Sequence, residues 1–148
     1  QLVVLGVPES AHAATRAALA PDVRDRVCFA PFLSQTLMPR LYQNAAALLY
    51  PTLYEGFGFP TLEAQAVGTP VLMSALGSLA ELVGPGAVVL GPDDRDGWIE
   101  TARAAVEARR NGASPNDAAR RWARRFTWEA SAAAHLAVYR RAAGKIAA

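Results

Sequence analysis

Short apolar segments alternate with longer mixed segments along the first 90 residues. Most of the apolar segments are followed directly by a glycine or a proline, which is typical of strands buried in a parallel sheet. Strands are therefore predicted at residues 2–6, 26–30, 45–50, 70–73 and 87–90. Helices are predicted between them, at residues 10–19, 36–44, 60–67 and 78–83. Because strands that alternate with helices indicate βαβ units, we expect the α/β class with a Rossmann-like, doubly wound parallel sheet.

After residue 90 the apolar positions recur at helical spacing, which predicts three C-terminal helices, at residues 96–110, at residues 115–126 and from residue 128 onward. Four hydroxyl side chains precede predicted helices and are expected to cap them: Thr36, Ser78, Ser114 and Thr127. The last two helices each have an apolar side that we expect to pack on the domain. These sides comprise Ala118, Trp122 and Phe126, and then Trp128, Ala132, Leu136, Tyr139 and Ala143.

Composition narrows the class of protein. The 148 residues are 52% hydrophobic and 19% charged, which excludes a disordered chain and fits a single domain. Cys28 is the only cysteine and is expected to be buried inside a strand as a small hydrophobic residue. The two histidines, His12 and His135, stand far apart, so no metal site is predicted. The chain begins at Gln1 without a signal sequence, so we expect part of a longer, cytoplasmic protein, with a membrane surface as an alternative location.

Charge is unevenly distributed. Residues 1–100 carry 5 basic and 10 acidic side chains, whereas residues 101–148 carry 10 basic and 3 acidic ones. A basic half can face an anionic membrane, another domain or only solvent. Binding to nucleic acid is not expected. The helix predicted at residues 115–126 uses its aromatic side for packing, and no turn typical of a DNA-binding motif accompanies it.

One loop combines features that suit a phosphorylated ligand. It covers residues 50–63, between a predicted strand and a predicted helix, where open α/β sheets bind ligands. Gly56 and Gly58 let the backbone approach a ligand, and the helix that begins at Pro60 offers unpaired N–H groups to an anion. A plain tight turn is the alternative reading of the two glycines. Phe57 and Phe59 can form a ligand wall or pack in the core.

Two glutamates flank these glycines. Glu55 precedes them and Glu63 follows, and carboxylates beside a phosphate cradle suit the hydroxyl groups of a sugar or a ribose. The alternative for Glu63 is a favourable interaction with the helix dipole. Tyr42 and Tyr50 are expected in the core.

The Glu-x7-Glu spacing of Glu55 and Glu63, the Gly-Phe-Gly-Phe-Pro between them and the Gly-Thr-Pro-Val at residues 68–71 resemble the retaining GT-B glycosyltransferases of the "group 1" family. Further similar segments lie at residues 41–45 and 126–129, so the resemblance covers nearly the whole chain. It implies that residues 1–148 form the C-terminal, donor-binding domain of a GT-B fold. Its first strand, which is central in the family's sheet, and the N-terminal acceptor domain would both be absent.

The resemblance also implies roles for individual residues. Glu55 would be the catalytic residue that contacts hydroxyls of the transferred sugar, and Glu63 would hold the ribose hydroxyls. The sugar and the diphosphate would contact Gly56, Phe57, Gly58, Phe59, Thr61 and Leu62, and the nucleobase would lie near Phe32 and Leu33. The expected reaction is hexosyl transfer with retention from a nucleotide-diphosphate sugar, such as a UDP-, GDP- or ADP-sugar, without a metal or another cofactor.

The chain lacks the Gly/Arg loop and the lysine with which the family grips the diphosphate, so we expect it to be inactive on its own and active only within a full-length enzyme. The expected partners are the donor, the acceptor domain and a lipid-linked acceptor or membrane surface, but no nucleic acid. Two alternatives come from other classes. The chain could be a non-catalytic nucleotide-sugar or sugar-phosphate binding module, or a structural protein that completes its sheet with another chain.

Overall fold

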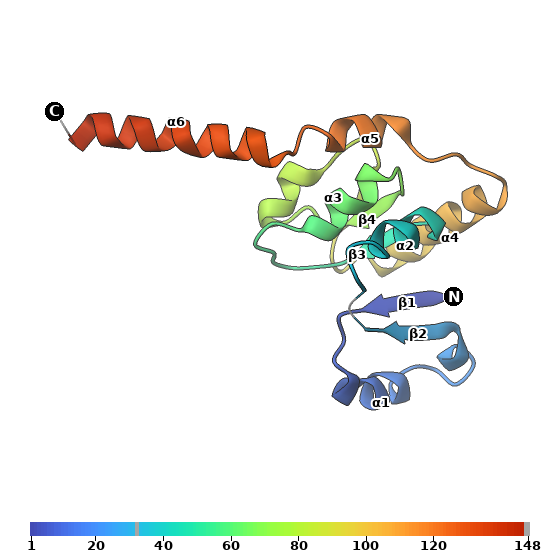
Figure 1. The fold of residues 1–148 in the computed structure, drawn as a ribbon. Helices are drawn as coiled ribbons and strands as arrows, with labels where there is room; N and C mark the ends of the chain where they lie inside the picture. The colour runs from blue at the N-terminus through green and yellow to red at the C-terminus, as the bar shows by residue number, and fades with distance from the viewer. Residues whose placement is uncertain (32, 147–148) are drawn as a thin grey trace. The chain divides into compact units, whose positions relative to one another are not determined.

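The computed structural model describes residues 1–31 and 33–146, without the side chains of residues 145 and 146. The described chain forms two compact units, Gln1–Arg40 and Leu41–Ala148, and Figure 1 follows their elements in order. All pairings between described strands are parallel, which confirms the predicted α/β class. Each unit has its own sheet, and each is described below by itself.

The N-terminal unit contains one βαβ motif. Its elements are β1 (Leu2–Leu5), α1 (Glu9–Ala17), a short 3₁₀ helix η1 (Arg24–Arg26) and β2 (Val27–Ala30). The two strands and α1 lie within about two residues of the prediction, and η1 was not predicted. The strands pair with Leu2 opposite Val27 and Leu5 opposite Ala30. Cys28 is exposed, so the expected burial is wrong. The ring of Phe29 stacks on His12 of α1, and alternate residues of a strand face opposite sides, so Cys28 faces away from α1.

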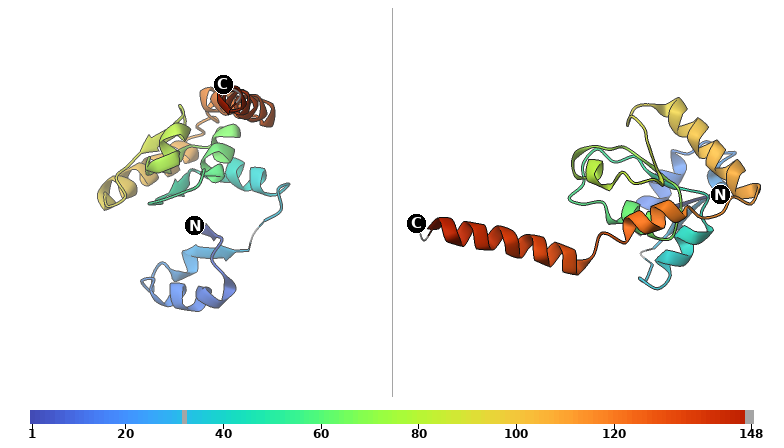
Figure 2. Two further views of the ribbon diagram at one scale, coloured as in Figure 1. Left: turned by 90° about the vertical axis from the view of Figure 1, so that its left-hand side faces the viewer. Right: turned by 90° about the horizontal axis from the view of Figure 1, so that it is seen from above.

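The C-terminal unit is built on three parallel strands in the order β3-β4-β5. They are β3 (Leu48–Tyr50), β4 (Val71–Met73) and β5 (Ala87–Val89). The central strand β4 is at most 1% exposed at each of its three residues. Because neighbouring residues of a strand point to opposite faces, both faces of the sheet are covered here. α3 (Phe59–Ala66) and α4 (Arg95–Arg110) both pack against β4 (Figures 1 and 2).

The remaining helices are α2 (Met38–Asn44), the 3₁₀ helix η2 (Gly77–Leu82), α5 (Asp117–Ala123) and α6 (Trp128–Ile146). The hydrophobic core of this unit lies between β4, α3, η2 and α5, and includes the fully buried residues Ala64, Leu79, Leu82 and Ala119. Among the described strands, β1 and β3 each have one hydrogen-bonded neighbour.

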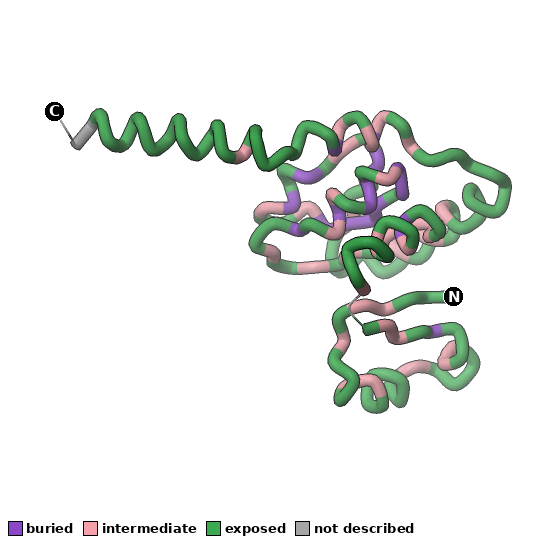
Figure 3. The backbone as a smooth tube through the Cα atoms, in the orientation of Figure 1, coloured by how far each residue is buried: buried purple, intermediate pink, exposed green. Residues whose placement is uncertain are grey.

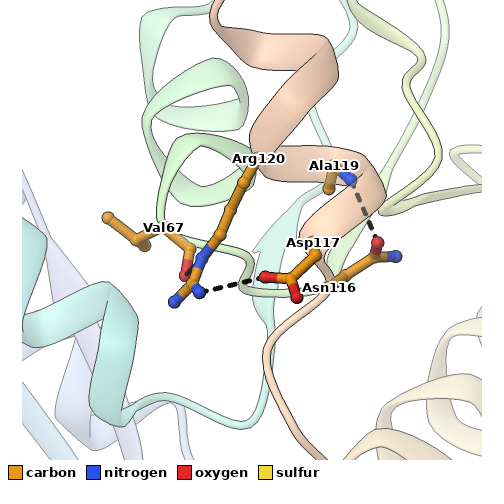
Figure 4. Close-up of polar contacts among 5 residues, drawn as sticks. All are labelled: Val67, Asn116, Asp117, Ala119 and Arg120. Carbon is orange, nitrogen blue, oxygen red and sulfur yellow. Dashed lines mark hydrogen bonds and ion pairs between the residues drawn. The ribbon is translucent and has the colours of Figure 1, made fainter.

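α5 closes the C-terminal end of α3 (Figure 4). Gly68, with a φ of +81°, ends α3, and its carbonyl accepts a hydrogen bond from the Asn116 N–H at 2.9 Å. The Nε of Arg120 donates to the Val67 carbonyl at 3.1 Å, while its Nη1 lies 3.2 Å from the Asp117 carboxylate. A cation at the last carbonyls of a helix also interacts favourably with the helix dipole.

Three of the four predicted caps are wrong, and neighbouring backbone contacts explain why. Asn116, not Ser114, caps α5 by accepting from the Ala119 N–H at 3.0 Å, because the contact with Gly68 places the start of the helix there. Thr36 lies in a turn before α2, and its hydroxyl shares a hydrogen bond with the Ser34 hydroxyl at 2.8 Å. Ser78 lies within η2, and its hydroxyl donates to the Glu55 carbonyl. Thr127 is confirmed as the cap of α6, since its hydroxyl accepts from the Ala130 N–H at 3.1 Å.

The apolar side predicted for α6 is exposed along its length (Figure 3). Trp128 is 79% exposed and Tyr139 is 64% exposed, so their predicted packing is wrong. Phe126, at 36% exposure, is also a surface residue, although its ring lies 4.9 Å from that of Trp122. The helical spacing is correct, but nothing among the described residues covers this side of the helix.

Candidate functional site

The loop that connects β3 to α3 is fixed by hydroxyl groups beneath it. Ser78 donates to the Glu55 carbonyl at 2.8 Å and reaches the Phe57 carbonyl at 3.4 Å. The hydroxyl of Ser74, which is fully buried just after β4, donates to the Thr52 carbonyl. The loop therefore sits over the carboxyl ends of β3 and β4, at the edge where α/β sheets bind ligands.

The carboxylate of Glu55 is held by two hydroxyls on one oxygen. Tyr50, the last residue of β3, donates to Oε1 at 2.7 Å, and the Thr52 hydroxyl lies 3.3 Å from the same oxygen and shares its one proton with the Tyr54 carbonyl at 3.2 Å. No hydrogen bond from the described residues reaches Oε2. Burial, followed by the hydrogen bond and the charge of Glu55, raises the pKa of Tyr50, so its hydroxyl keeps its proton and acts as the donor at neutral pH.

Glu63 is held in a similar way from another element. It lies on the exposed side of α3, and Tyr42 of α2 donates to its Oε2 at 3.1 Å. Tyr42 is only 4% exposed. Burial raises the pKa of Tyr42, with further contributions from the charge and hydrogen bond of Glu63 and from Tyr50.

The two glycines of the loop have different surroundings. Gly58 has a φ of +96°, and a Cβ there would collide with the Leu79 side chain, so both conformation and packing require glycine. Gly56 has a negative or extended φ, and a Cβ there would meet nothing within 4 Å. The fold therefore requires a glycine at position 58, whereas the space beside Gly56 is open and the fold does not require a glycine there.

A row of backbone donors leads into α3. Among the described residues, no hydrogen-bond partner is found for the N–H groups of Gly56, Phe57, Gly58 and Phe59. Thr61 is different, because it is fully buried and both its N–H and its hydroxyl donate to the Gly58 carbonyl, at 3.1 and 2.8 Å. Thr61 closes this turn, and its expected contact with a ligand stays a prediction.

The apolar candidates lie at the surface of the same turn. The rings of Phe57 and Phe59 are 4.5 Å apart, and the residues are 38% and 49% exposed, so neither is in the core. Leu62 is half-buried on α3. Leu33 belongs to the N-terminal unit, and Phe32 lies outside the described residues, so their proposed contact with a nucleobase stays a prediction.

Sequence reasoning missed the partners of the two glutamates. It placed Tyr42 and Tyr50 in the core as packing residues, which is correct for the buried ring of Tyr42 but overlooks both hydroxyls. It also interpreted Ser78 as a helix cap. For Tyr50, its place at the end of an otherwise apolar segment is the available signal, because a buried hydroxyl requires a hydrogen-bond partner.

Within residues 1–31 and 33–146, no three or more side chains are grouped so that they could hold a metal ion. No helix in this part of the chain combines the length and the hydropathy that a membrane span needs.

Comparison with known proteins matches residues 1–122 to the family described as "Glycosyl transferases group 1". A D-inositol 3-phosphate glycosyltransferase of Mycobacterium marinum is 33% identical, in an alignment that covers 97% of this chain and 33% of the relative. An MMP alpha-(1->4)-mannosyltransferase of Mycolicibacterium hassiacum is 36% identical over 78% of this chain and 29% of the relative. An O-antigen chain mannosyltransferase of Salmonella typhimurium is 34% identical over 66% of this chain and 28% of the relative. The chain thus spans about a third of the length of these relatives.

Proposed function

Because the chain belongs to the "Glycosyl transferases group 1" family, we propose that it forms the donor site of a glycosyltransferase, which moves a sugar from a nucleotide-diphosphate sugar to an acceptor. The observation that carries the proposal is the position of Glu55 and Glu63 before and after four backbone N–H groups that have no hydrogen-bond partner among the described residues. The loop and the start of α3 thus offer donors for an anion and acceptors for hydroxyl groups at one edge of the sheet.

The diphosphate is assigned to the N–H groups of residues 56–59. Unpaired N–H groups at the start of a helix attract anions, and the helix dipole adds to this attraction. The open space around Gly56 leaves room for close approach of a ligand to the backbone. Neighbouring carboxylates would repel a phosphate, so Glu55 and Glu63 suit the uncharged hydroxyl groups on either side of it.

The sugar hydroxyls are assigned to Glu55 and the ribose hydroxyls to Glu63. Each carboxylate has one oxygen without a hydrogen bond from the described residues, and that oxygen can accept from the ligand. The mannosyltransferase names of two relatives favour a hexose as the transferred sugar. In this proposal transfer retains the anomeric configuration, needs no metal, and occurs only when the chain is joined to an acceptor-binding domain.

The test is a calorimetric titration of this chain with UDP, GDP and ADP and with their common sugar conjugates. One nucleotide should bind, and Glu63→Gln should weaken it roughly tenfold or more, because a hydrogen bond to a charged group is lost. Glu107→Gln, on the exposed surface of α4, is the matched control and should leave binding unchanged. Absence of binding by a chain that unfolds cooperatively would contradict the donor-site proposal.

A further inference from the structure

Both candidate glutamates receive a tyrosine hydroxyl, although the pairs are built from different elements. Tyr50 of β3 donates to Glu55, and Tyr42 of α2 donates to Glu63 of α3. A carboxylate can only accept hydrogen bonds, so both tyrosines are the donors. In each pair, one carboxylate oxygen is held while the other has no hydrogen bond from the described residues.

The stability of the fold does not explain the hydroxyl of Tyr42. Phenylalanine would fill the same volume, and it would avoid burial of a polar group that needs a partner. The hydrogen bond runs from this buried ring, 4% exposed, to a carboxylate at the protein surface. A surface glutamate is fully solvated without such a bond. What the bond does is restrict the rotamers of Glu63, which would otherwise be mobile.

Glu55 is restricted at both ends. Its carbonyl accepts from the Ser78 hydroxyl at 2.8 Å, which fixes the backbone. Its Oε1 accepts from Tyr50 at the end of β3, and the Thr52 hydroxyl of the loop, which it shares with the Tyr54 carbonyl, lies beside the same oxygen. With Oε1 held in this way, the direction of Oε2 is restricted. A group held in its binding geometry beforehand loses less conformational entropy when the ligand arrives.

We propose that Tyr42 and Tyr50 are positioning residues: each hydroxyl fixes one oxygen of its glutamate so that the other oxygen accepts from a hydroxyl group of the ligand. The inference rests on the proposed function and adds to it the residues that orient the two carboxylates. The tyrosines act through the glutamates and do not touch the ligand. Tyr42 therefore supports binding of the nucleotide through Glu63, and Tyr50 supports binding of the sugar through Glu55.

This division of roles gives the two tyrosines different signatures in titrations of this chain with the bound nucleoside diphosphate and its sugar conjugate. Tyr42→Phe should weaken both ligands about three- to tenfold, as expected for the loss of one hydrogen bond. Tyr50→Phe should leave the affinity for the nucleoside diphosphate unchanged and reduce only the additional affinity given by the sugar. Tyr139→Phe, which removes an exposed hydroxyl on α6, is the control and should change neither.

Double variants show whether each tyrosine acts through its glutamate. Tyr42→Phe added to Glu63→Gln, and Tyr50→Phe added to Glu55→Gln, should weaken binding little beyond the glutamate substitution alone. The inference is overturned if the tyrosine variants bind like the wild type while the glutamate variants bind weakly, and the proposed function then stands. Equal weakening of both ligands by Tyr50→Phe also overturns it. Failure of the folded wild-type chain to bind any nucleotide overturns the proposed function together with the inference.

Discussion

The hydroxyl of Ser78 donates to the carbonyl of Glu55 at 2.8 Å and joins two segments that are 23 residues apart in the chain. Ser78 belongs to η2, which packs in the core through the fully buried Leu79 and Leu82. The hydrogen bond therefore connects the loop that carries Glu55 to a rigid part of the unit. The position of this glutamate depends on a residue that lies outside the loop.

Ser78→Ala should therefore loosen the loop. The substitution leaves the Glu55 carbonyl without its hydroxyl donor, and we expect a loss of about 1 kcal/mol in the free energy of unfolding. Binding of the proposed sugar conjugate should weaken as well, because the backbone of Glu55 is less restrained. Chemical denaturation measures the first effect and calorimetry the second. Ser114→Ala, at an exposed serine that does not cap a helix, should change neither, and equal behaviour of the two variants would contradict the anchoring role.

Gly56 and Gly58 should respond in opposite ways to the same substitution. Gly58→Ala puts a Cβ into the Leu79 side chain at a φ of +96°, so it should lower the free energy of unfolding by at least about 2 kcal/mol. Gly56→Ala meets no atom within 4 Å and should leave stability unchanged or slightly higher. In the proposed function, however, it should weaken nucleotide binding, because the methyl group occupies the space through which the ligand approaches the backbone.

Gly77→Ala separates the two expected causes of destabilisation by Gly58→Ala, which are backbone strain at a positive φ and collision with the Leu79 side chain. Gly77 has a φ of +57°, but a Cβ there would meet nothing within 4 Å, so only the backbone strain of about 1 kcal/mol applies. Thermal unfolding of the three variants should rank Gly58→Ala as the least stable and Gly56→Ala as the most stable. A reversed order for Gly56 and Gly58 would show that the loop is built differently.

The strands and most helices could be predicted from the sequence because their signals are local. An apolar segment followed by glycine or proline predicts a strand, as for β3 and β5, and the structure agrees to within three residues. Burial is less local, since it depends on which elements lie nearby. Cys28 and Trp128 have the pattern of packed residues, but among the described residues no element of its own unit covers either side chain.

The candidate site was also only partly predictable. Glu55 and Glu63 stand out because carboxylates rarely flank a glycine-rich turn, and their spacing is visible in one segment. Their tyrosine partners were not predictable in the same way. Tyr42 lies 21 residues before Glu63, and the hydrogen bond between them arises from the packing of α2 near α3. The cap of α5 was wrong for a similar reason, since the contact of Asn116 with Gly68 joins distant segments.

The raised pKa values of Tyr42 and Tyr50 predict that the folded chain loses stability at high pH. The pKa of each hydroxyl lies above its ordinary value of about 10, chiefly because of burial and also because of its glutamate. The unfolded chain therefore releases these protons first as the pH rises, while the folded chain keeps them. A state that binds fewer protons is favoured by rising pH, so the free energy of unfolding should fall above about pH 10 and stay unaffected by these groups below it.

Denaturant unfolding between about pH 8 and pH 11.5 tests this expectation. Each tyrosine can contribute a slope of up to about 1.4 kcal/mol per pH unit. The wild-type chain should therefore lose stability more steeply than a Tyr42→Phe/Tyr50→Phe double variant, which has no phenol to titrate at these positions. Tyr139→Phe, at an exposed tyrosine, should follow the wild type. Parallel curves for the wild type and the double variant would mean that both hydroxyls titrate alike in the folded and unfolded chains, and that neither is held by its glutamate.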